Sequence, residues 1–124
     1  MAQANTRHVN QQDVNKVAKY IYKHTDGAYQ IKFGANFVDV YMNVYYHTGV
    51  ADDPIQTMRL DINLTSYSDK IRYNVTEMDI MENTFLHGTV EVKDPTDLEP
   101  IRKAIYDRIV RAIQQEFEDY DFIF

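Results

Sequence analysis

Histidine and carboxylate side chains are the groups in this 124-residue chain whose chemistry could support catalysis or metal binding. An HExxH spacing would place two imidazoles on one helix face to hold zinc. The four histidines show no such spacing: His8, His24, His47 and His87. Only His87 could share a surface with Asp39 and Asp61, and such a trio arises easily by chance. We therefore expect no catalytic residue and no metal site.

Acidic pairs and glycines provide no specific motif either. Asp52–Asp53 and Glu116/Glu118 are typical of loop and surface charge, whereas general acid–base pairs need a cleft and shifted pKa values. Four glycines in all give no phosphate-cradling loop. The absence of cysteine removes thiol catalysis, disulfides and thiolate metal ligands together. The sequence therefore predicts a protein that is not an enzyme and needs no cofactor.

Length, composition and charge indicate one soluble domain covering residues 1–124. The hydrophobic fraction of 44% with 26% charged residues is typical of globular proteins. The net charge of −6 opposes broad nucleic-acid binding, which depends on neutralising phosphates with Lys and Arg. No apolar run approaches the roughly 20 residues that span a bilayer. Residues 1–8 are polar and are expected to form a flexible tail without a signal peptide, so we expect a cytoplasmic protein with no membrane partner.

A helix is predicted over residues 10–26. Asn10 can cap its first turn, and Asp13 completes an acidic variant of the capping box. Gly27 suits a left-handed cap at the helix end. A narrow apolar stripe follows helical spacing: Val14, Val17, Ala18 and Ile21.

From Tyr29 the hydrophobic period changes to two, which is typical of strands. The expected strands cover, in order, residues 29–33, 38–46, 55–65, 71–77 and 84–92. The Gly34–Asn36 segment is either a tight turn between two short strands or a bulge in one long strand. A change of pattern near Glu77 predicts a bulge or a strand end. Short polar connections between the later strands predict a meander.

A second, longer helix is predicted from a cap at Asp97 to about Asp119. Pro100 then falls in the first turn, where its missing N–H is harmless. Two neighbouring apolar stripes make a face wider than one sheet contact requires. The excess packs either on the first helix or on another subunit.

These elements predict an α+β fold: an N-terminal helix, an antiparallel meander of about four to five strands, and a long C-terminal helix. Two helices side by side, each about 10 Å wide, would cover one face of a four-stranded sheet about 19 Å across. The other face is left open. That open face is the first candidate for function.

Strand alternation places residue types that are enriched in protein interfaces on or near the open face. The candidate interface residues there are Phe37, Tyr41, Tyr45, Arg59, Asp61, Arg72, Phe85 and His87. The alternatives are an ordinary solvated sheet face, and a surface for a ligand or nucleic acid on which the tyrosines stack bases. Asp39 and Asp61 on the same face oppose phosphate.

The last residues complete the candidate interface: Phe122, Ile123 and Phe124. Three apolar residues left in water at a chain end would form a small sticky patch. They dock either on the protein's own core or on a neighbouring subunit or partner.

Taken together, these features favour a non-enzymatic interaction or assembly protein that associates with itself or with another protein. Nucleic acid is an unlikely partner, and a small nucleic-acid- or ligand-binding module on the tyrosine-rich face is the alternative. The abundance of Tyr and Asn, which have AT-rich codons, suggests a phage or mobile-element source. A structural component, virion-associated in a phage, or an inhibitor of a host protein would fit that source.

Overall fold

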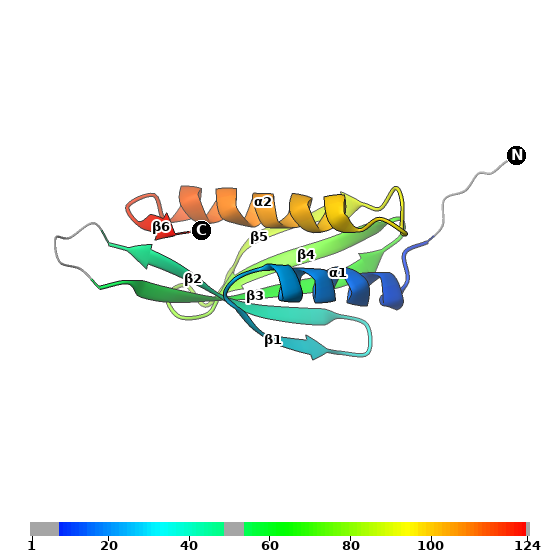
Figure 1. The fold of residues 1–124 in the computed structure, drawn as a ribbon, viewed down its shortest axis with the longest axis horizontal. Coiled ribbons are helices and arrows are strands. Elements are labelled where there is room, and N and C mark those ends of the chain that lie inside the picture. Colours follow the sequence, from blue (N-terminus) through cyan, green and yellow to red (C-terminus); the bar gives the residue numbers. More distant parts are fainter. Residues whose placement is uncertain (1–7, 49–53, 124) are drawn as a thin grey trace, which may run out of the picture.

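Two helices and six antiparallel strands form two layers, with both helices on one face of the sheet (Figure 1). The computed structural model describes residues 8–48 and 54–123, so most of the predicted tail lies outside the described residues. The elements are, in chain order, α1 (Gln11–His24), β1 (Ala28–Phe33), β2 (Val38–His47), β3 (Gln56–Tyr67), β4 (Lys70–Glu77), β5 (Thr84–Glu91), α2 (Glu99–Glu116) and β6 (Asp121–Ile123). The predicted α+β fold is confirmed.

Local hydrogen bonds fix the start of α1 as predicted. The side chain of Asn10 accepts a bond from the amide of Asp13 at 3.0 Å, and the Asp13 carboxylate accepts one from the amide of Asn10 at 3.1 Å. This reciprocal pair is a capping box. The amide of Val9 donates to the carbonyl of Ser68 at 2.7 Å, which ties the helix start to the β3–β4 turn.

Gly27 is not the cap of α1 that the sequence predicts. The helix ends at His24, and its cap is Thr25 in extended backbone conformation. Gly27 does have a φ of +98°, but a Cβ there would lie 2.4 Å from the carbonyl oxygen of Asn43 in β2. The amide of Asn43 also donates to the carbonyl of Gly27 at 2.7 Å. Glycine is required because the chain passes this close to β2.

The meander is confirmed, with strand order β1-β2-β3-β4-β5. The amide of Gly34 donates to the carbonyl of Phe37 at 2.8 Å, so the Gly34–Asn36 segment is a tight turn between β1 and β2. Alternate residues of β2 and β3 are buried beneath the helices: Val38, Val40, Met42, Val44, Tyr46, Met58, Leu60, Ile62 and Leu64. The period of two therefore identified the core face correctly.

A bulge lies between β4 and β5, close to the irregularity predicted at the end of β4. The pairing shifts between Val75 and Thr76, which leaves Phe85 as the extra residue on β5. The Phe85 ring contacts Phe117 at the end of α2, with centroids 6.3 Å apart. The expectation that Phe85 lies on the open face is therefore wrong, because the bulge turns its side chain toward the helix layer.

The start of α2 also differs from the prediction. Leu98 occupies the cap position and makes no side-chain capping bond. Asp97 belongs to the preceding turn, where its amide donates to the carbonyl of Asp94 at 3.1 Å, but its carboxylate still accepts a bond from the amide of Glu99 at 3.4 Å. Pro100 lies in the first turn as predicted, and the helix ends at Glu116 rather than near residue 119.

One buried stripe faces inward from α2, at every fourth residue: Ile101, Ile105, Ile109 and Ile113. These residues belong to the same core cluster as the apolar stripe of α1 and the inner face of the sheet. The helix contacts both α1 and β5, so its wide apolar face packs within the chain. Among the described residues, no helix is both long enough and apolar enough to cross a membrane.

The sixth strand was not predicted. In β6, Ile123 pairs with Tyr45 and Phe122 with Tyr46 of β2. The ring of Phe122 lies 5.8 Å from that of Tyr46 and 6.3 Å from that of Tyr120. Phe122 therefore docks on the chain's own core, which is one of the two alternatives that the sequence leaves open for the chain end. Phe124 lies outside the described residues.

Candidate functional site

The uncovered sheet face carries two rows of mostly polar side chains that cross the meander. Because facing residues of antiparallel neighbours lie side by side, the strand register defines both rows. The first row consists of Lys32, Asp39, Asn63, Asn74 and His87. The second consists of Gln30, Tyr41, Asp61, Thr76 and Thr84. Three predicted interface residues therefore lie in these rows: Tyr41, Asp61 and His87.

Two carboxyl groups meet at the centre of these rows. Asp39 is buried and accepts a bond from the side-chain amide of Asn63 at 2.8 Å. Burial, and then the charge of Asp39 and a hydrogen bond to it, raises the pKa of Asp61 to about 7, while Lys32 opposes the shift. When Asp61 is protonated, it donates a hydrogen bond to Asp39. The Oδ1 atom of Asp61 is buried and has no hydrogen-bond partner among the described residues. The pair lines a shallow depression of about 430 Å³.

Exposed aromatic and aliphatic side chains gather at one end of the same face. We call Tyr29, Tyr41, Tyr45 and Ile123 the tyrosine patch. The rings of Tyr29 and Tyr41 have centroids 6.4 Å apart, and Ile123 faces Tyr45 across the β6–β2 pair. Tyr29 is 43% exposed, Tyr45 38% and Ile123 44%. Such residues bury large areas at small entropic cost when they meet a partner.

Arg59 borders the tyrosine patch and is held in place by Asp79. Its guanidinium donates to Asp79 Oδ1 through Nε at 2.8 Å and Nη2 at 2.6 Å, and its amide donates to Oδ2 at 3.1 Å. This two-pronged contact fixes the guanidinium plane. The pair is exposed, so water screens most of its contribution to stability.

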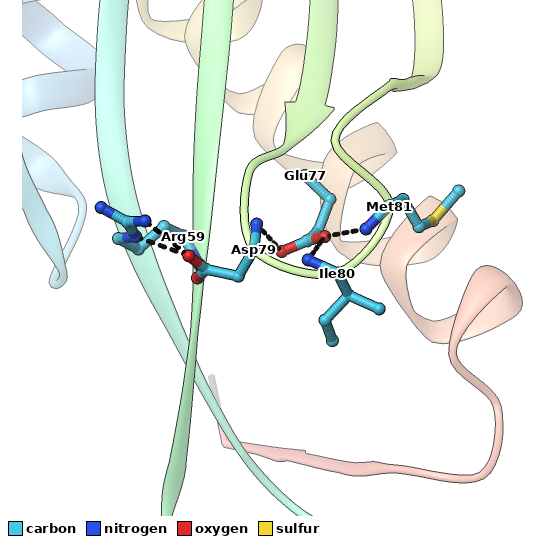
Figure 2. Close-up of polar contacts among 5 residues, drawn as sticks. All are labelled: Arg59, Glu77, Asp79, Ile80 and Met81. Atoms are coloured by element: carbon cyan, nitrogen blue, oxygen red, sulfur yellow. Dashed lines mark hydrogen bonds and ion pairs between the residues drawn. The ribbon is translucent and has the colours of Figure 1, made fainter.

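Glu77 fixes the turn that carries Asp79, as Figure 2 shows. Its fully buried carboxylate accepts bonds from the amides of Asp79, Ile80 and Met81 at 2.7, 2.5 and 2.6 Å. Asp79 points the other way, toward Arg59 on β3 (Figure 2). A buried acid at the end of β4 therefore determines where a surface arginine lies on β3.

The other predicted interface residues lie away from the tyrosine patch. The Arg72 guanidinium stacks on Tyr67, 4.3 Å from the ring centroid, near the opposite end of β3. Phe37 lines the depression beside the Asp39–Asp61 pair. His87 lies at the β5 end of the first row, opposite Asn74. Among the described candidate residues, Phe85 and Phe122 pack toward the helix layer, and the rest lie along the open face without forming one site.

Sequence reasoning missed one member of this surface, Tyr29, and one buried residue that supports it, Glu77. Simple alternation predicts an ordinary strand position for Tyr29, but the register of β1 shifts between Ala28 and Gln30. In the sequence, Glu77 stands out only as the point where the strand pattern changes. A carboxylate that directly precedes a turn with several free amides is a signal that could have revealed it.

The described residues include no group of three or more His, Asp or Glu side chains that could hold a metal ion. The nearest approach to an acid–base arrangement is the Asp39–Asp61 pair, which opens to solvent rather than to an enclosed cleft. The chain matches no protein-family model, and searches of curated proteins and of solved structures find no significant match.

Proposed function

We propose that the protein is a non-enzymatic assembly protein that associates with further copies of itself through the tyrosine patch. The observation that carries the proposal is the exposure of Tyr29, Tyr45 and Ile123 at one end of a sheet face that the chain leaves uncovered. Solvent-exposed sheet faces favour tyrosine for strand propensity alone. Strand propensity also favours isoleucine, but the Ile123 side chain that β6 adds to the patch is 44% exposed and has no polar group to meet water.

Charge supports a protein partner over nucleic acid. The buried Asp39 and the half-buried Asp61 lie beside the patch, and carboxyl groups repel the phosphate backbone. Arg59 is already neutralised by Asp79 and offers little to a phosphate. Tyrosine and a preorganised arginine are residues that dominate binding at protein interfaces.

Multi-angle light scattering over a range of protein concentrations tests the proposal. We expect reversible self-association that Tyr45→Thr weakens at least tenfold, since central aromatic residues typically contribute about 2 kcal/mol or more to binding. Tyr67→Thr is the matched control, because Tyr67 is 50% exposed but lies at the opposite end of β3. A chain that stays monomeric at the highest concentration, or equal weakening by both changes, would refute the proposal.

A further inference from the structure

A notch in the sheet edge lies next to the tyrosine patch. Both β1 and β6 pair with the same edge of β2, β1 along residues 38–42 and β6 along residues 45–47. Figure 1 shows the two short strands beside opposite ends of β2. Between them lies a cavity of about 200 Å³. Pockets for drug-sized ligands measure about 300–1,000 Å³, so this one suits a group the size of a single side chain.

The cavity has an aliphatic wall and four polar residues, one of which is Asn43. Its apolar lining comes from Met42, Val44 and Ile123, and its polar lining includes Asp26, Tyr45 and Tyr106. Within residues 8–48 and 54–123, the Asp26 carboxylate has no hydrogen-bond or ion-pair partner, and the same holds for the hydroxyls of both tyrosines. A few convergent polar groups above an apolar surface are typical of a binding site.

The charge around the cavity is negative. Burial, and then the charge of Asp107, raises the pKa of Tyr106; Asp26 adds to the effect and Arg102 opposes it. All three charged groups therefore lie within electrostatic reach of the Tyr106 hydroxyl. Arg102 is already paired with Glu99 at 2.6 Å, and neither aspartate forms an ion pair within the part of the chain that the structure describes. A cation is favoured over an anion or a neutral group.

We propose that this cavity anchors a primary ammonium group on an aliphatic stem, namely a lysine side chain presented by the bound partner. Asp26 supplies the countercharge, the tyrosines supply ring faces and hydroxyl acceptors, and the aliphatic wall contacts the stem. Lysine fits better than arginine because its charge is compact, whereas a guanidinium is a broad planar fork. The partner role rests on the proposed function, since the cavity shares Tyr45 and Ile123 with the tyrosine patch.

Amide NMR of the labelled full chain, titrated with n-butylammonium, tests the site without any partner. We expect saturable shifts at Asp26, Val44 and Tyr106 with a dissociation constant on the order of 1–10 mM, as suits five non-hydrogen atoms. The neutral n-butanol should bind at least fivefold more weakly. Asp26→Asn should weaken n-butylammonium at least fivefold, and Asp119→Asn, which removes an exposed charge elsewhere, should not.

Three outcomes would overturn the anchor site. They are no saturable shift below about 50 mM, which is about five times the upper end of the expected range, equal binding of n-butanol, and equal binding by Asp26→Asn. Tighter binding of n-butylguanidinium would assign the cavity to arginine and overturn the lysine proposal. Asp26 is exposed, so the Asp26→Asn variant should fold. A second variant, Tyr106→Leu, independently tests the contribution of the Tyr106 ring and hydroxyl to binding. Since the titration needs no self-association, its failure is distinguishable from failure of the proposed function.

Discussion

The carboxyl pair at the centre of the open face makes the stability of this protein depend on pH in an unusual direction. Most paired carboxylates in proteins have lowered pKa values and stabilise the fold as pH rises. Asp61 has a pKa raised to about 7, first by burial and then by Asp39. Between pH 4 and pH 7 the folded chain retains a proton that the unfolded chain releases. Asp61 therefore makes the fold progressively less stable as pH rises through that range.

The size of the effect follows from the shift. About three units at about 1.36 kcal/mol per unit set an upper bound near 4 kcal/mol. Asp61 is only half-buried, so water screens part of this energy and we expect roughly 1–2 kcal/mol. Asp61→Asn keeps a donor for Asp39 and removes the ionisable group. The variant should match the natural chain near pH 4 and exceed its stability by about 1–2 kcal/mol at pH 8.

Urea denaturation followed by circular dichroism at pH 4, 6 and 8 measures the difference. Asp119→Asn is the matched control, because Asp119 is exposed in the turn before β6. The effect of Asp119→Asn on the free energy of unfolding should be the same at pH 4, 6 and 8. The reasoning about Asp61 fails if the Asp61→Asn difference is flat across this range, or if the variant is less stable at pH 8.

Three further changes test the fold around the candidate surface by the same urea assay. Glu77→Gln should lower the free energy of unfolding by about 2–3 kcal/mol, because one amide oxygen cannot replace a buried carboxylate that serves three amides. The control Asp79→Asn, which breaks the exposed ion pair, should lower it by less than about 1 kcal/mol. Equal losses would contradict this reasoning. Gly27→Ala should lose at least about 1 kcal/mol through its positive φ and the approach to β2, and a neutral result would count against that contact. Phe122→Ala should lose about 1–2 kcal/mol through its lost ring contacts, and no loss would mean that β6 does not dock in solution.

The fold was largely predictable because its signals are local and periodic. The capping box at Asn10 and the alternation of β2 needed no knowledge of distant residues. The predicted cap at Asp97 is displaced by one residue: Leu98 occupies the cap position, while the Asp97 carboxylate still accepts a bond from the amide of Glu99 at 3.4 Å. Phe85 failed as a surface residue because a bulge shifts the strand register by one residue, which moves a side chain to the other face.

The candidate site was less predictable because its geometry depends on contacts between distant segments. The pairing of Asp39 with Asp61 requires the β2–β3 register, and the contact of Arg59 with Asp79 spans 20 residues. The exposure of Ile123 beside Tyr45 depends on β6, a three-residue strand too short to show a period. The sequence points to the open face and to the chain end as separate candidates, and it does not place Ile123 beside Tyr45.

Rigidity links the buried acid at the end of β4 to binding at the surface. Association is weakened by the entropy lost when flexible side chains become ordered, and surface arginines lose much of it. Arg59 avoids part of that loss because Asp79 already holds its guanidinium, and Glu77 holds the turn that carries Asp79. Glu77→Gln should therefore weaken self-association as well as stability, even though Glu77 is wholly buried. Light scattering under strongly native conditions, where the variant stays folded, should show a several-fold loss; unchanged association would mean that Arg59 takes no part in the contact.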